Sequence, residues 1–305
     1  MDIGALLKLM LPGKVRWKMM DLLALLPDEL YIRLFYFAVT GRILNLKNPV
    51  TFEDKQNWLK LNDQHPEYRD LADKLKVRNH IKETIGEGYS FPLLGSWERF
   101  EDIDFALLPN QFVIKCNHDS GSTRVIKDKS LLTKKDHQEL EKHFVKRLKN
   151  DFFFAGREYP YKGIHPCIMA EQYMTDEKQE KTGLDDYKFY CFNGIPKIVL
   201  IVTDRATDIH YDFFDMDFNR LDLHYGTPSA EGRITRPAFF DEMKEIAAKL
   251  SAGIRFVRLD MFAVGGRPYF GEYTFFDGGG FQYLNPEEWE YRLGSWIDLD
   301  SRPAN

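Results

Sequence analysis

Two strand-like runs decide the fold: FVRLDMF at residues 256–262 and YFGEYT at residues 269–274. The Gly265-Gly266 pair between them favours a tight turn, so we expect the runs to pair as an antiparallel hairpin. Working outward, short β-type runs begin at about residue 91, whereas residues 1 to about 85 carry apolar residues at helical spacing. This distribution predicts an α+β protein with largely antiparallel sheets.

Turn and cap signals divide the rest of the chain. Asn193-Gly194 is the strongest hairpin signal, and Pro27-Asp28 marks a helix break and restart. Thr51 can cap a helix, and the acid three residues later, Asp54, can accept a hydrogen bond from the Thr51 backbone N–H to complete a capping box. Further strands are expected at 112–114, 168–170, 189–192 and 198–202, and further helices at about 130–150 and 237–252.

Length and composition exclude several classes of protein. At 305 residues the chain fits two or three lobes, so a cleft between lobes is available. A net charge of −5 gives no sign of a nucleic-acid partner, and no apolar run approaches the roughly 18 residues of a transmembrane segment. The N-terminus lacks a signal-peptide pattern, and the three cysteines have no CxxC spacing. We therefore expect a mature cytoplasmic protein with reduced, buried cysteines.

The first candidate site combines two acids with an arginine. Strand alternation puts Arg258 and Asp260 on one face, and Glu272 and Thr274 on one face of the next strand. If the strands pair, the two carboxylates converge and offer hard oxygen ligands for Mg²⁺, with positions left for phosphate oxygens. The same acids could instead form a structural ion-pair network with Arg258 or Arg255, and the spacing leaves both interpretations open.

The second candidate site is a lysine at the end of a strand. Lys115 follows Phe112-Val-Ile and precedes a turn that contains Ser120, Gly121 and Ser122. A lysine beside such a turn provides a point charge and backbone N–H groups for a phosphate, although the order is not that of a P-loop. A polar hairpin loop with a solvated lysine is the simpler alternative.

The third candidate site is an apolar strand that ends in an acid. Glu171, Gln172 and Tyr173 have the form of a hinge whose backbone meets an adenine while a carboxylate takes a ribose hydroxyl. Lys188, on the following strand, could reach the phosphates, although a lone strand lysine is more often at the surface.

In order and spacing, these pieces resemble the TupA-like branch of the ATP-grasp fold, which is named for teichuronopeptide biosynthesis. The resemblance runs from about residue 45 to 295. It is carried by NPVTFEDK (48–55), LPNQFVIKCNHDSG (108–121), DYKFYCFNG (186–194), VRLD (257–260) and YFGEYTF (269–275).

The resemblance implies an ATP site with assigned residues. Lys115 and Lys188 would contact the phosphates, and both would serve catalysis together with Arg258, which would stabilise the oxyanion. The other nucleotide contacts implied are the closing turn Ser120, Gly121 and Ser122 and the hinge residues Glu171 and Tyr173.

The implied Mg²⁺ ligands are Asp260 and Glu272, with Thr274 at a third position. Many ATP-grasp enzymes have asparagine where this chain has Thr274, so that metal position would be weaker or bridged by water. The branch also usually has glycine where this chain has Asp119, so an acid could lie near the triphosphate.

The resemblance further implies an ATP-dependent carboxylate-amine ligase that acts through an acyl phosphate. Its substrates would be an amino acid and a hexuronic acid carboxylate of a bacterial surface or capsule polysaccharide, or of a nucleotide- or lipid-linked precursor. Arg157, His165, Arg205 and His210 are candidates for the anionic acceptor, although each could be a surface or structural residue.

We expect a helical or substrate region at 1–108, an ATP-grasp lid lobe at 109–174 and a catalytic lobe at 175–305. The N-terminal helical region could contact the inner face of a membrane peripherally, or a second copy in a homodimer.

Two rival functions remain. Asp215-Met-Asp217 has the DxD form that glycosyltransferases use to hold a metal and a nucleotide-sugar diphosphate. Thr274 and Asp119 also make a nucleotide-binding module without turnover plausible. Release of ADP rather than UDP or GDP, and the response to Asp260→Asn, would separate these alternatives.

Overall fold

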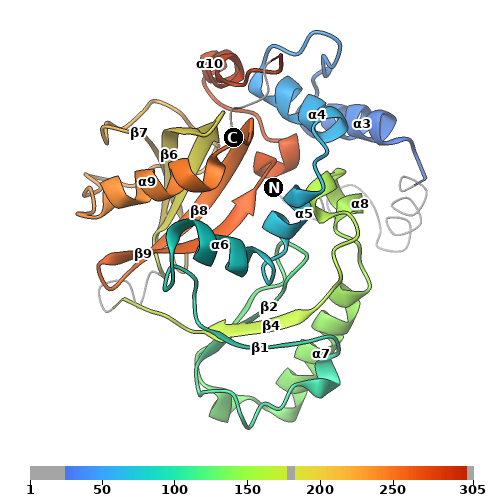
Figure 1. Cartoon of the computed structure of the whole chain (residues 1–305), viewed down its shortest axis with the longest axis vertical. Coiled ribbons are helices and arrows are strands. Elements are labelled where there is room, and N and C mark those ends of the chain that lie inside the picture. Colours follow the sequence, from blue (N-terminus) through green and yellow to red (C-terminus); the bar gives the residue numbers. More distant parts are fainter. Residues whose placement is uncertain (1–24, 177–182, 301–305) are drawn as a thin grey trace.

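Two antiparallel sheets form the framework of the computed structural model, which describes residues 25–176 and 183–300. The smaller sheet has the order β1-β4-β2-β3 and the larger one the order β7-β6-β5-β8-β9 (Figure 1). The smaller sheet consists of β1 (Leu93–Trp97), β2 (Phe112–Cys116), β3 (Arg124–Ile126) and β4 (Ile168–Gln172). The larger sheet consists of β5 (Asp186–Phe192), β6 (Ile195–Thr203), β7 (His210–Asp215), β8 (Phe256–Val264) and β9 (Arg267–Thr274).

Helices cover the outer faces of both sheets, with α7 against the smaller sheet and α9 across the larger one (Figure 1). The helices are α3 (Asp28–Thr40), α4 (Phe52–Asn62), α5 (Glu67–Ala72), α6 (Val77–Ile85), α7 (Lys134–Leu148), α8 (Phe153–Gly156), α9 (Phe240–Ser251) and α10 (Glu288–Trp296). Short 3₁₀ turns are η1 (Phe100–Asp102), η2 (Lys129–Leu131), η3 (Tyr159–Tyr161) and η5 (Asp277–Gly280). The helical pattern predicted before residue 25 lies outside the described residues.

The local signals in the sequence account for several element boundaries. Helix α3 begins at Asp28, and Thr51 and Asp54 form the expected capping box at the start of α4. Both glycine turns join neighbouring antiparallel strands, and Asn193 and Gly194 have the positive φ angles that such turns require. Strands β1 and β3 were not predicted. Strand β1 precedes residue 109, so the smaller sheet draws on both sides of the boundary expected there.

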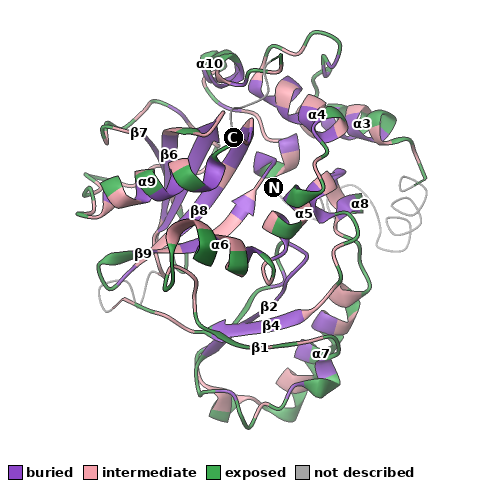
Figure 2. Cartoon of the chain, in the orientation of Figure 1, coloured by how far each residue is buried: buried purple, intermediate pink, exposed green. Residues whose placement is uncertain are grey.

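Alternation along the strands of the larger sheet separates a packed face from a polar face. Phe189 and Cys191 of β5 meet α9, where Phe189 lies against the ring of Phe240. Lys188 and Tyr190 alternate with them and therefore point to the opposite face. Figure 2 shows the strands of this sheet as largely buried, whereas the outer turns of the helices are exposed.

Helix α4 carries an unusual buried polar face. Gln56, Asn57 and Lys60 are fully buried, and each makes a hydrogen bond to the backbone of η5. Gln56 accepts from the Asp277 N–H at 2.7 Å, and Asn57 donates to the Gly280 carbonyl at 2.6 Å. The helix therefore fixes the turn that follows β9.

The three cysteines are free; Cys116 and Cys191 are buried, whereas Cys167 is only partly buried, which corrects the expectation for that residue. Within residues 25–176 and 183–300, no helix is both long and apolar enough to cross a bilayer.

Candidate active site

A cavity of about 720 Å³ lies between the two sheets, and residues of both sheets line it. Most of the candidate residues from the sequence meet here. Those in the lining are Lys115, Ser120, Gly121, Glu171, Tyr173, Lys188, Arg205, Asp260 and Glu272.

Three charged side chains form a row across the larger sheet. Asp260 of β8 lies directly opposite Glu272 of β9 on one side and opposite Lys188 of β5 on the other. Side chains at paired positions of neighbouring strands project from the same face, and all three line the cavity. The β8–β9 hairpin thus brings the two acids together as the sequence predicted.

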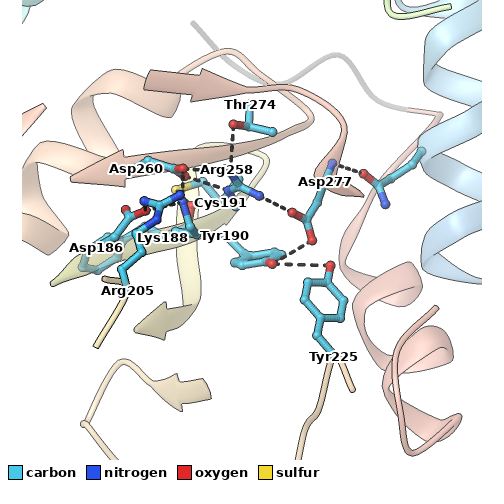
Figure 3. Close-up of polar contacts among 12 residues, drawn as sticks. Asp186, Lys188, Tyr190, Cys191, Arg205, Tyr225, Arg258, Asp260, Thr274 and Asp277 are labelled. Atoms are coloured by element: carbon cyan, nitrogen blue, oxygen red, sulfur yellow. Dashed lines mark hydrogen bonds and ion pairs between the residues drawn. The ribbon is translucent and has the colours of Figure 1, made fainter. Parts of the chain in front are cut away.

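The carboxylate of Asp260 is paired on both oxygens (Figure 3). Oδ1 accepts from Nε of Arg258 at 2.7 Å, and Oδ2 accepts from the same guanidinium at 2.8 Å and also contacts the Lys188 ammonium. The ammonium lies 2.6 Å from Oδ2 of Asp186, which in turn accepts from Arg205 at 2.8 Å. Acids and bases therefore alternate from Arg258 and Asp260 on β8 to Arg205 in the β6–β7 loop.

The pKa values within this network follow from burial and pairing. Burial raises the pKa of Asp186, and Lys188 and Arg205 offset only part of that effect. Burial alone would also raise the pKa of Asp260, but Arg258 and Lys188 outweigh it and lower the pKa. Burial opposes the charge on Lys188, yet Asp186 and Asp260 raise its pKa. Lys188 and Asp260 are therefore charged at neutral pH.

Arg258 lies behind Asp260, outside the cavity lining, and its guanidinium is held on several sides. It contacts Oδ1 of Asp277, and it donates to the Thr274 hydroxyl at 3.1 Å (Figure 3). Tyr190 also donates to Asp277, at 2.7 Å. Thr274 therefore supports Arg258 and lies outside the cavity lining.

On the smaller sheet, Lys115 is paired with the hinge acid. Its ammonium lies 2.6 Å from Glu171, and Arg78 donates to the same carboxylate at 3.1 Å. Because β2 and β4 are neighbours, this pairing fixes Lys115 at the wall of the cavity. Tyr173 follows β4 and also lines the cavity.

The turn after β2 is held from two sides through Asp119. Arg147 of α7 lies 2.6 Å from the Asp119 carboxylate, and Lys74 donates to the Asp119 carbonyl at 2.6 Å. Ser122 is buried and donates to Asp119 at 2.6 Å, so it supports the turn from inside. Ser120 and Gly121 face the cavity instead. Asp119 itself also lines the cavity, so the acid lies at the candidate site as expected, with its carboxylate paired to Arg147 and Ser122.

The four acceptor candidates lie in different places. Arg205 lines the cavity, whereas His210 lies outside its lining and pairs with Asp204 at 3.3 Å. Arg157 is buried against the ring of Tyr31, and His165 lies at the surface beside Glu98. The structure therefore brings only Arg205 of this group into the cavity lining.

Three site residues were missed in the sequence. Asp186 and Lys74 line the cavity, and the Lys74 ammonium lies 3.8 Å from Glu272. Asp186 stands two residues before Lys188, so strand alternation could have placed it on the same face. Asp277 precedes a run of three glycines, which indicates a tight turn. Lys74 lies in a turn between α5 and α6, and no local pattern in the sequence marks it as a site residue.

The donor set fits a magnesium ion that is bound together with a nucleotide. Among the described residues, no group of three or more His, Cys, Asp or Glu side chains is arranged to hold a metal on its own. Mg²⁺ bound with a nucleotide usually takes only one or two carboxylates and completes its shell with phosphate and water oxygens. Asp260 and Glu272 supply two such carboxylates at one wall of the cavity.

Comparison with known proteins extends this picture. Residues 54–298 match the family described as TupA-like ATPgrasp, which is most of the chain. The chain belongs to the TupA-like ATP-grasp family. The α+β ATP-grasp fold expected from the sequence is thereby confirmed. No curated protein matches the chain.

Solved structures with a similar fold are remote from this TupA-like chain. A D-alanine–D-alanine ligase from Bacillus anthracis complexed with ATP is 15% identical over 67% of this chain and 53% of that one, with a TM-score of 0.37. The ATP-grasp ligase PsnB complexed with minimal precursor, Mg and ADP is 15% identical over 74% and 60%, with a TM-score of 0.36. A RimK domain protein from Sphaerobacter thermophilus DSM 20745 is 11% identical over 75% and 67%, with a TM-score of 0.41. The chain thus spans about half the length of the first of these.

Proposed function

We propose that this protein is an ATP- and Mg²⁺-dependent ligase that joins a carboxylate to an amine through an acyl phosphate. One observation carries the proposal. Lys115 of the smaller sheet and the row Lys188, Asp260 and Glu272 of the larger sheet line one cavity. Cations from two sheets can hold a triphosphate between them, while the acids offer oxygen ligands to its metal.

The charged residues divide the work of phosphoryl transfer. Lys115 and Lys188 offset the negative charge of the triphosphate, and Lys74 adds a third cation near Glu272. Asp260 and Glu272 would hold Mg²⁺, which when bound supplies further neutralisation of phosphate charge. A substrate carboxylate oxygen attacks the γ-phosphorus, so that ADP leaves and an acyl phosphate forms.

The second step forms the amide. The amine nitrogen attacks the acyl carbon, and inorganic phosphate leaves. Arg258 is our candidate for the oxyanion because it lies two residues from Asp260 on the same face of β8. Its contacts with Asp260 and Asp277 also fix the Asp260 carboxylate. The turn with Ser120 and Gly121 would exclude water from the acyl phosphate.

For substrates we propose a hexuronic acid of a bacterial surface polysaccharide, or its nucleotide- or lipid-linked precursor, and an amino acid. The resemblance to the teichuronopeptide branch supports this choice. Arg205 is half-exposed at the cavity and is the best candidate to face the anionic acceptor. A cytoplasmic location, contact with the inner membrane face and a homodimer stay predictions.

The test is incubation of the full chain with ATP, Mg²⁺, a glucuronic- or galacturonic-acid glycan and pooled amino acids. We expect ADP release that depends on both acceptors, and an amide-linked mass increase of the glycan. Absence of both signals across a broad panel of acids and amines would overturn the proposal.

The geometry does not favour the glycosyltransferase rival. Asp215 accepts hydrogen bonds from the backbone N–H groups of Asp217 and Asn219, so the DxD acid stabilises its own turn. A nucleotide-binding module without turnover would keep nucleotide binding and form no product. Loss of ATP-dependent product in Asp260→Asn, with nucleotide binding retained, would favour an enzyme over such a module.

A further inference from the structure

The ammonium of Lys188 contacts Asp260, one of the two carboxylates that would hold the metal ion. Lys188 and Asp260 are directly opposite each other on β5 and β8, their side chains are in contact, and both line the cavity. The Lys188 side chain is only 10% exposed. A divalent ion that binds Asp260 from the cavity must therefore compete with a cation that the chain itself supplies.

Displacing Lys188 without giving it another partner is unfavourable. The remaining Asp260 contacts come from Arg258, which lies behind the carboxylate and outside the cavity lining. A buried ammonium that loses one of its carboxylates keeps its desolvation cost and loses part of its compensation. A metal ion alone therefore gains one carboxylate at the expense of an existing ion pair.

A triphosphate changes this balance because it offers Lys188 new partners. The lysine side chain is a flexible four-carbon chain with a point charge, so a small rotation can move its ammonium to phosphate oxygens. Asp186 remains compensated when that happens because Arg205 donates to it at 2.8 Å. The residues around Lys188 thus permit its exchange between a carboxylate and a phosphate.

We propose that Lys188 competes with the divalent ion for Asp260, and that the triphosphate relieves this competition by taking Lys188. The inference rests on the proposed ATP site and adds a coupling to it. Metal and nucleotide each strengthen the binding of the other, through one named residue. Such coupling is reciprocal, and factors of roughly 5 to 150 are typical.

The experiment measures binding of Mn²⁺, a paramagnetic substitute for Mg²⁺, by electron paramagnetic resonance. The full chain is titrated with and without a non-hydrolysable ATP analogue. We expect Mn²⁺ to bind at least about tenfold more tightly when the analogue is present. In Lys188→Met, we expect Mn²⁺ to bind about tenfold more tightly than in the wild type without analogue. The coupling factor should fall about tenfold, to the part that phosphate oxygens supply directly as metal ligands.

Three matched variants locate the effect. Lys188→Arg keeps a cation at Asp260 and should keep the coupling. Lys115→Met removes a lysine of the opposite sheet, paired with Glu171, so the analogue should bind more weakly while coupling persists. Adding Asp260→Asn to Lys188→Met should abolish the metal binding gained without analogue.

Several outcomes would overturn the inference. One is equal Mn²⁺ affinity of the wild type with and without the analogue, a result that needs no variant to fold. Another is a folded Lys188→Met protein whose coupling equals that of the wild type. If the analogue fails to bind the wild type at all, the proposed ATP site itself fails, whereas binding without coupling overturns the inference alone.

Discussion

The partly buried Arg258 and the buried Asp277 form an ion pair that joins strand β8 to the turn after β9. Gln56 of α4 accepts the Asp277 N–H, and Tyr190 donates to its carboxylate. The fixed carboxylate of Asp277 therefore orients the Arg258 guanidinium, which in turn donates to Asp260. This relationship makes Asp277 a positioning residue for the candidate site.

Replacing Asp277 by asparagine should weaken both stability and turnover. The neutral amide leaves one side of a buried guanidinium without its counter-charge, so the free energy of unfolding should fall by roughly 1–3 kcal/mol. We expect kcat of the proposed ligase to fall more than its KM for ATP changes. Urea unfolding and steady-state kinetics check this. Glu87→Gln, which breaks an exposed ion pair with Lys82, should shift stability by less than about 0.5 kcal/mol.

Glu290 should make stability depend on pH. Burial raises its pKa to about 7 from the ordinary 4.5, although the N–H groups of Leu284 and Glu53 offset part of the effect. The folded state then holds a proton that the unfolded state has released between these values. The stabilisation is fully present below pH 4.5 and is lost as pH rises through 7.

At about 1.4 kcal/mol per pKa unit, the difference between a pKa of 4.5 and one of about 7 gives a loss of at most roughly 3.5 kcal/mol from this one carboxyl. Urea unfolding at a series of pH values from 4.5 to 8 measures it. In Glu290→Gln the decline should be shallower, whatever the stability of the variant at a single pH. Parallel curves for the two proteins would contradict the assignment.

Lys115→Met should weaken the use of ATP. Its ammonium is the cation that the smaller sheet offers at the cavity wall beside Glu171, and its loss leaves triphosphate charge uncompensated. We expect kcat/KM for ATP to fall about a hundredfold, equivalent to about 2.7 kcal/mol. Lys82→Met, at an exposed site of α6, is the control. Equal kinetics for the two variants would refute the role.

The two acids of the hairpin should differ in their response. Asp260→Asn leaves Lys188 and Arg258 without a shared carboxylate, so we expect ADP formation to fall at least about a thousandfold. Glu272→Gln should instead raise the Mg²⁺ concentration for half-maximal rate by about tenfold. Asp217→Asn removes the second acid of the DxD sequence and should leave ADP release unchanged. Release of UDP or GDP from a sugar donor by the wild type, lost in this variant, would instead revive the glycosyltransferase alternative.

The hairpin that carries Asp260 and Glu272 could be predicted because its signals are local. Alternation fixes the face of each strand, and Gly265-Gly266 fixes the turn that pairs them. The approach of Lys115 to the same cavity depends on contacts between distant segments. It was expected only because the order of the motifs resembles a known family.

The missed residues show the limit of local patterns. Asp277 meets Arg258 because Gln56 of α4 holds the turn that begins at Asp277. Nothing near residue 277 in the sequence indicates a contact with α4. Lys74 reaches the cavity from a turn after α5, and short strands such as β3 depend on their neighbour for pairing. Thr274 was expected near the metal, whereas its hydroxyl accepts from Arg258.

The buried polar face of α4 has a consequence for any attempt to shorten the protein. Gln56, Asn57 and Lys60 supply hydrogen bonds to a turn more than 200 residues away in the chain. A fragment cut between the helices and the sheets would lose these donors and acceptors, and the backbone around Asp277 would be released with them. Helix α4 is thus structurally inseparable from the larger sheet, and we expect neither piece to fold when it is produced alone.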